Sequence, residues 1–319
     1  MTVLFLDYEN EAFPTGVLPN VRRRLSVTWD DILWAAVTVG RPDVYHVFRH
    51  GQASVHEAIF RWSMVRMALQ QRGQRGQKLV RTDLFKQMDP TEKGAVNYFL
   101  GLLTCKMFAS KLLDAPWALH LDVFRPMLSP RTLGGRSRPD MVAQSTKTGQ
   151  WHAFECKGRA SVPGNIEKQK AKAQAQRLVS VGGTTCTLHV GAITFFRNDA
   201  IEFYWRDPEP GAREPIKVPD PAIAWHAYYS PFVEVIRSFA EPIGGAPEPP
   251  GLLQIAELDL SIRVHPAIAP SLFKADWQRA HEEAKERSEE FASDGYQPDG
   301  LLVKAGPSWF ERFEMPELR

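Results

Sequence analysis

Two short segments of the chain carry acidic and basic side chains in a pattern that suits metal-ion chemistry. The first is Pro139-Asp140 and the second is Glu155-Cys156-Lys157. If the second segment is a β-strand, Glu155 and Lys157 project from one face, because side chains alternate along a strand. Cys156 then points to the other face and is most simply a small core residue.

A hairpin would bring the two acids together. If the strand of Asp140 pairs in register with that of Glu155, both carboxylates come within reach of one ion. With the backbone carbonyl of Cys156 they form an all-oxygen set that suits Mg²⁺, a hard cation that keeps several waters. Such an ion lowers the pKa of a bound water and offsets charge at a phosphorus centre. Lys157, on the same face, could orient the attacking hydroxide or stabilise the transition-state charge.

The elements around these segments predict an α/β core rather than a bundle or an all-β sandwich. A helix with apolar residues every three or four positions comes first, and three strands follow. A helix rich in alanine, glutamine and lysine and a β-branched strand come last. In order, these elements cover residues 90–113, 117–124, 138–144, 151–157, 166–181 and 184–196.

The two motif segments, separated by a spacer of 14 residues, resemble the signature of the PD-(D/E)xK nuclease superfamily, which has the restriction-endonuclease-like fold. The superfamily core is a helix, a three-stranded meander carrying the motif, a helix and a further strand (αβββαβ), which is the order predicted here over about a third of the chain. The resemblance implies a Mg²⁺-dependent phosphodiesterase, usually acting on DNA, in which Mn²⁺ substitutes. Asp140 and Glu155 would be metal ligands, and Lys157 the catalytic lysine.

Composition and predicted elements divide the whole chain into three regions. Residues 1–88 are predicted to form a basic, mainly helical N-terminal region, with a helix over 54–71. Residues 89–206 form the nuclease core, and residues 207–319 form a proline-rich and acidic C-terminal extension that is irregular or helical.

Glu92 is a candidate for a further metal ligand, because many superfamily members add an acidic residue from the first core helix. The alternative is a helix cap, since Asp89, Pro90 and Glu92 have the types favoured at the N-cap, first and third helical positions. The sequence leaves both readings open.

Several basic and polar side chains are candidates for contacts to nucleic acid, and each has a structural alternative as a solvated surface group. Phosphate contacts position a nucleic acid without specifying its sequence. The candidates flanking the motif are Arg138, Arg159, Lys168, Lys172 and Gln176, and those in the N-terminal helix are Arg61 and Arg66.

The formal net charge is only +2, but the charged residues are unevenly distributed along the chain. Residues 20–86 hold about 12 basic against about 5 acidic residues, and residues 131–177 about 10 against about 3. Residues 240–319 reverse this, with about 8 basic and about 15 acidic residues. Two basic segments flanking the candidate site favour a polyanionic partner.

Composition excludes several other classes of protein. No apolar run approaches the ~18 residues of a membrane span, and the first residues lack a basic secretory n-region. The 3 cysteines are far apart, which implies no disulfide framework and no zinc-type pair, so a reducing cytoplasm is expected. No glycine-rich phosphate loop supports use of ATP.

These observations favour a metal-dependent DNA endonuclease. The resemblance to the superfamily suggests a role in restriction or phage defence, because many of its members have such roles. RNA as the substrate is not excluded, and a non-catalytic subunit that binds nucleic acid or protein is a different class of function. A homodimer or a larger defence complex would be consistent with the resemblance.

Overall fold

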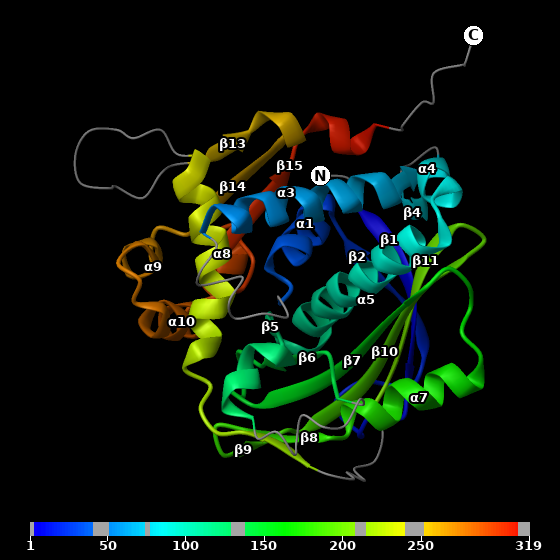
Figure 1. Cartoon of the computed structure of the whole chain (residues 1–319), viewed down its shortest axis with the longest axis horizontal. Helices are drawn as coiled ribbons and strands as arrows, with labels where there is room; N and C mark the ends of the chain where they lie inside the picture. Colours follow the sequence, from blue (N-terminus) through cyan, green and yellow to red (C-terminus); the bar gives the residue numbers. More distant parts are fainter. Residues whose placement is uncertain are drawn as a thin grey trace.

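One large curled sheet of nine strands, mixed parallel and antiparallel, organises this α/β protein (Figure 1). The structure is a computed structural model, and it describes residues 3–40, 51–73, 77–128, 138–207, 215–239 and 252–311. Along the sheet the strands follow the order β2 (Arg22–Val27), β1 (Leu4–Glu11), β4 (Lys78–Arg81), β11 (Ala200–Arg206), β10 (Leu188–Arg197), β7 (Trp151–Arg159), β6 (Met141–Gln144) and β5 (Trp117–His120). The ninth strand, β3 (Leu69–Arg72), pairs with β4.

Helices α5 (Pro90–Leu113) and α7 (Asn165–Ala175) lie on opposite sides of β7 and β10 (Figure 1). The α5 side holds the main core, where Phe108 stacks on Phe203 of β11 with ring centroids 4.2 Å apart. The α7 side holds a small cluster of Ile193, Phe195 and Tyr204. The sheet is therefore covered on both faces near the strand that carries Glu155.

Two glycines let α5 cross β7 at very short range. A Cβ placed on Gly158 of β7 would lie 1.5 Å from the backbone oxygen of Asn97, and one on Gly101 of α5 would lie 2.9 Å from the backbone carbon of Lys157. Only residues without a side chain fit this crossing. The close contact fixes the strand segment that carries the candidate catalytic residues against the longest helix.

The predicted element order from residue 90 to 196 is present as α5, β5, β6, β7, α7 and β10, although several bounds differ. Helix α5 has the predicted ends. Strand β5 stops at His120, and residues Leu121–Met127 form a 3₁₀ helix, because the N–H of Asp122 bonds to His120 Nδ1 and the N–H of Leu121 bonds to the Asp140 carbonyl. Strand β6 begins at Met141 rather than at residue 138.

The predicted helix over 166–181 is too long. Helix α7 ends at Ala175, and the remaining residues form strand β8 (Leu178–Val181) of a small sheet with β9 (Thr184–Thr185) and β12 (Ile216–Val218). Ile216 pairs with Leu178 from far along the chain, a partner that local propensity does not reveal.

The N-terminal region contains more strand than the mainly helical prediction allowed. Strands β1 to β4 all join the large sheet, and β1 pairs in parallel with β11, so residues before 88 share one sheet with the predicted core. Its helices are α1 (Trp29–Thr38), α3 (Gly51–Ala68) and α4 (Asp83–Gln87). Helix α3 begins three residues before the predicted cap at Ser54.

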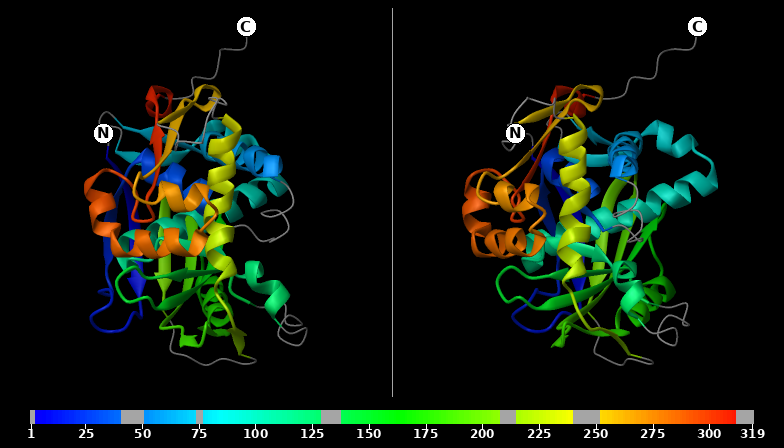
Figure 2. Two further views of the ribbon diagram at one scale, coloured as in Figure 1. Left: turned by 90° about the vertical axis from the view of Figure 1, so that its left-hand side faces the viewer. Right: turned by 60° about the vertical axis from the view of Figure 1, so that its left-hand side comes forward.

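The C-terminal extension is also more ordered than predicted. It adds the long helix α8, beside which α9 and α10 lie, and a sheet of three strands (Figure 2). These elements are α8 (Ile223–Phe239), β13 (Leu253–Ile255), a 3₁₀ turn (Ala256–Leu258), β14 (Leu260–Val264), α9 (Ala269–Phe273), α10 (Trp277–Glu286), α11 (Ser288–Ser293), β15 (Leu301–Ala305) and a 3₁₀ helix (Pro307–Phe310). The helical part of residues 269–293 is thus divided into three short helices. Among the described helices, none is both long enough and apolar enough to cross a membrane.

Candidate active site

The hairpin β6–β7 brings Asp140 and Glu155 together. Met141 pairs antiparallel with Phe154, so the residue before Met141 lies opposite the residue after Phe154. The backbone N–H of Cys156 donates to Asp140 Oδ2 at 2.8 Å, which fixes the Asp140 carboxylate beside β7. The in-register pairing predicted for these two segments is present.

Glu155 is a buried carboxylate that is only half satisfied. Its side chain is 1% exposed, and Oε1 forms an ion pair with Lys157 Nζ. Its other oxygen, Oε2, has no hydrogen-bond partner in the described part of the chain. A buried polar atom without a partner costs about 1–3 kcal/mol, and more when it carries charge, so this oxygen fits a site that receives a cation or a proton.

The environment opposes full ionisation of the two carboxyl groups. Burial raises the pKa of Glu155 to about 8, with a further contribution from the nearby charge of Asp140. Burial also raises the pKa of Asp140, against the opposing effects of the Cys156 N–H and Lys157. At neutral pH the pair therefore retains a proton, which a divalent cation would displace on binding.

Lys157 remains protonated beside this pair. Burial lowers its pKa, but the attraction of Glu155 and Asp140 outweighs burial, and the net shift is upward. Its side chain is 40% exposed, so the ammonium reaches solvent while it contacts the buried acid. A cation in this position can stabilise negative charge on a group that approaches from solvent.

Cys156 has the structural role predicted from strand alternation. Its side chain is fully buried toward α5, where it lies beside Cys105, and burial raises the pKa of its thiol. The N–H and C=O of one strand residue point to the same side, so the Cys156 carbonyl is directed toward Asp140. The backbone oxygen, and not the sulfur, is the group that fits a hard cation here.

Three further residues that the sequence analysis missed surround the pair. Tyr98 of α5 bonds through its hydroxyl to His120 Nε2 at 3.3 Å, and Asp122 follows in the 3₁₀ helix. Burial lowers the pKa of His120 to about 4, so its ring is neutral at pH 7. Burial raises the pKa of Tyr98, and the charge of Asp140 adds to this. Residue type and spacing gave no signal for this group, because it forms only when α5 packs against β5.

Glu92 does not join the carboxylate pair. It occupies the third position of α5, where its Oε2 accepts the backbone N–H of Asp89 at 3.1 Å in a capping box. Within the described ranges, no set of three or more His, Cys, Asp or Glu side chains is arranged to hold a metal ion. The helix-cap reading is confirmed, and Glu92 as a metal ligand is a prediction that the geometry does not support.

The basic candidates close to the motif in the sequence are engaged in contacts within the protein. Arg138 contacts Asp122 at 2.7 Å, and Arg159 contacts Glu167 of α7 at 3.3 Å. Lys168 lies over the ring of Tyr204, with Nζ 3.8 Å from the centroid. All of these surface contacts are of the kind that a phosphate group can replace at small cost.

The other two candidates on α7 give less information. Gln176 caps the C-terminus of the helix and is partly buried. The side chain of Lys172 lies outside the described residues.

Arg61 is a structural residue and not a phosphate contact. Its side chain is 6% exposed, forms an ion pair with Glu57 at 2.8 Å and donates to the carbonyl of Val39 at 2.7 Å. Burial lowers its pKa. The sequence prediction for Arg61 is wrong, because helical periodicity alone did not show that this face of α3 packs against α1.

Arg66 is likewise engaged within the protein. It donates to the carbonyl of Ser308 at 2.6 Å and lies over the ring of Trp309, 5.5 Å from the centroid. It therefore holds the C-terminal 3₁₀ helix against α3, and its role in binding nucleic acid stays a prediction.

Comparisons of this chain with protein-family models, curated proteins and solved structures find no match. The functional argument rests on the chemistry of the carboxylate pair and on the elements that position it.

Proposed function

We propose that this protein is a Mg²⁺-dependent endonuclease that hydrolyses phosphodiester bonds of DNA. The observation that carries the proposal is the half-satisfied buried Glu155, placed opposite Asp140 and beside the ammonium of Lys157. Two carboxylates and the Cys156 carbonyl would hold the ion, which leaves room for the waters that Mg²⁺ retains.

The arrangement of elements supports the same proposal. A helix, three antiparallel strands, a helix and a strand follow one another as α5, β5, β6, β7, α7 and β10, with β10 parallel to β7. This is the αβββαβ order of the PD-(D/E)xK core that the motif resembles, with β8 and β9 inserted before the last strand. Glu155 and Lys157 lie on its third strand, and Asp140 directly precedes its second strand, which agrees with that resemblance.

The roles of the side chains follow from their positions. When bound, Mg²⁺ supplies an acidified water and charge stabilisation at phosphorus. Asp140 and Glu155 hold and orient the ion, and the Cys156 N–H keeps Asp140 in position. Lys157 stabilises the negative charge that develops on the phosphoryl oxygens, since its ammonium reaches solvent from the same face as Glu155.

The test is cleavage of supercoiled plasmid by purified protein with Mg²⁺, and with EDTA as the metal-free control. Asp140→Asn, Glu155→Gln and Lys157→Met should each lower the rate at least about a hundredfold, the size expected when one transition-state contact is lost. Lys147→Ala changes a 61% exposed lysine in the loop of the same hairpin and should leave the rate unchanged. Equal cleavage by the wild type and Asp140→Asn would contradict the proposal, and a parallel assay on RNA distinguishes the two substrate classes.

A further inference from the structure

A cationic pocket lies on the sheet face that carries Glu155, but four residues further along β7, at the level of Arg159. Strands β7 and β10 finish there, and β11 begins there. A row of paired residues crosses the sheet at this end: Arg159 pairs with Phe195, Phe195 with Glu202, Glu202 with Asp7, and Asp7 with Arg24. Four strand spacings separate Arg159 from Arg24, or roughly 19 Å along the sheet.

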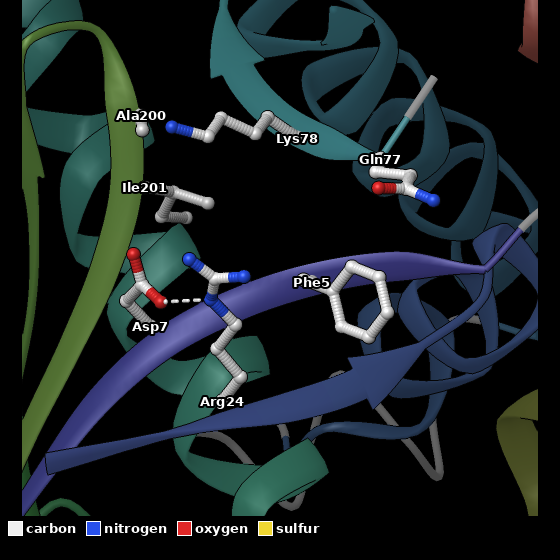
Figure 3. A pocket seen from close by; sticks show the side chains of 7 residues that line it. All are labelled: Phe5, Asp7, Arg24, Gln77, Lys78, Ala200 and Ile201. Atoms are coloured by element: carbon white, nitrogen blue, oxygen red, sulfur yellow. Dashed lines mark hydrogen bonds and ion pairs between the residues drawn. The ribbon is translucent and has the colours of Figure 1, made fainter. Parts of the chain in front are cut away.

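A small pocket at the Arg24 end of this row is lined by two cationic side chains (Figure 3). Its volume is about 60 Å³, enough for a group the size of a phosphate but not for a whole nucleotide. Arg24 uses Nε to contact Asp7 at 2.9 Å, and its guanidinium lies over β1. Lys78 reaches toward Ala200, and it has no ion-pair or hydrogen-bond partner among the described residues. The lining residues are Phe5, Asp7, Arg24, Gln77, Lys78, Ala200 and Ile201.

The surroundings of the pocket have more positive than negative charge. Glu202 is shared by Arg22 and Arg197, each at 3.1 Å. Asp199 is shared by Arg81, Lys86 and Arg72, and its hydrogen bonds to Lys86 and Arg81 lower its pKa. With Asp83, Asp7, Arg24 and Lys78 included, seven cationic side chains face four carboxylates.

We propose that this pocket binds a backbone phosphate of the nucleic-acid substrate. Glu155 lies four residues before Arg159, roughly 13 Å along β7, so the pocket is roughly 23 Å from the carboxylate pair. At 3.4 Å per phosphate, this is about seven nucleotides from the bond that is cut. The inference rests on the proposed nuclease function and adds a contact to the substrate. Lys78 and Arg24 supply the charge that holds the phosphate.

A neighbouring arginine provides a matched control. Arg23 is exposed on the same strand, but it pairs with Tyr8, whose side chain packs into the core on the opposite face. Replacing Arg23 removes the same charge from the same strand without changing the pocket. A general effect of net charge would therefore appear equally in Arg23→Ala and Arg24→Ala.

The experiment is a fluorescence-anisotropy titration of a short DNA duplex in EDTA, where no cleavage occurs. The double variant Arg24→Ala/Lys78→Gln should bind roughly tenfold more weakly at about 0.1 M salt, and its log–log salt slope should fall by about two. Arg24→Ala/Lys78→Arg should regain about one unit of slope relative to the double variant, and Arg23→Ala should bind within about twofold of wild type. Thermal melting checks that each variant is folded.

The outcomes separate this inference from the proposed function. If wild type binds and cleaves DNA but the double variant binds as tightly as Arg23→Ala, the pocket assignment is overturned and the nuclease assignment stands. If binding depends on Lys78 and Arg24 but no cleavage occurs with Mg²⁺, the inference stands and the catalytic proposal fails. Wild type that does not bind DNA in EDTA overturns the inference.

Discussion

At the scale of single residues, the central feature is a carboxylate placed where it is difficult to ionise. Glu155 is buried, faces Asp140 and has one oxygen without a partner in the described chain. Such a group destabilises the metal-free fold unless a proton or a cation occupies the site. The same property that weakens the empty protein therefore favours binding of a divalent ion.

This predicts a specific pH dependence of stability. The folded pKa of Glu155, about 8, lies above its ordinary value of 4.5, so the folded state binds the proton more tightly than the unfolded state. The stabilisation is complete below about pH 4.5 and is lost as the pH rises toward 8. In EDTA, the melting temperature should therefore fall over this window, and about 1 kcal/mol corresponds to roughly 2 °C in a chain of this size.

Glu155→Gln tests that prediction, because a neutral amide does not titrate. The variant should melt several degrees above wild type at pH 8 in EDTA, and the difference should shrink at pH 5 and after Mg²⁺ is added to wild type. A wild-type melting curve with no difference from Glu155→Gln across this range would show that Glu155 is not the titrating group.

Residue types and spacing were sufficient to predict that Asp140, Glu155 and Lys157 lie close together, because the pattern is local to one hairpin. They did not find Tyr98, His120 or Asp122, which gather only when α5 packs on β5. The same limit explains the error at Arg61, since burial against α1 cannot be inferred from a helical pattern alone.

At the scale of elements, the crossing of α5 and β7 positions the site. Helix α5 was predicted with its observed ends because its cap and its apolar period are both local. Strands β1 and β8 were missed because their partners, β11 and β12, lie far away in the sequence. The predicted and the missed elements differ in how local their stabilising contacts are.

Gly158→Ala tests whether the crossing positions the site. The added Cβ would meet the Asn97 oxygen and push α5 away from β7, so the variant should lose stability by at least about 2 kcal/mol and lose cleavage activity as well. Urea unfolding measures the first effect, and the plasmid assay measures the second.

Gly94→Ala is the matched control, because a Cβ at that exposed position of α5 meets nothing within 4 Å. It should stabilise the protein by up to about 1 kcal/mol, as alanine does in a helix. Equal stability and activity of Gly158→Ala and wild type would show that the close crossing is not required.

At the scale of the whole molecule, a buried polar network joins the C-terminal region to the core. Lys106 of α5 is fully buried and donates to the hydroxyl of Tyr228 on α8 at 2.6 Å. The same hydroxyl donates to Asp299 Oδ2 at 2.6 Å, and Trp34 Nε1 donates to that oxygen at 2.8 Å. Residues near 299 are therefore part of the core that supports α5.

Asp299→Asn should accordingly destabilise the protein by about 1–3 kcal/mol, because it replaces the buried carboxyl group that accepts from both Tyr228 and Trp34. Asp294→Asn, an exposed acid in the same segment, should cost less than about 1 kcal/mol. Urea unfolding of both variants measures the difference, and equal effects would exclude a special role for the network.

The most direct test of the account is a crystal structure of the protein grown with Mn²⁺, with an anomalous difference map calculated at the manganese edge. The account predicts one strong peak between Asp140 and Glu155, about 2.1 Å from a carboxylate oxygen of each, that is lost in Glu155→Gln. An ordered hairpin with no peak between these carboxylates, at saturating Mn²⁺ and neutral pH, would contradict it.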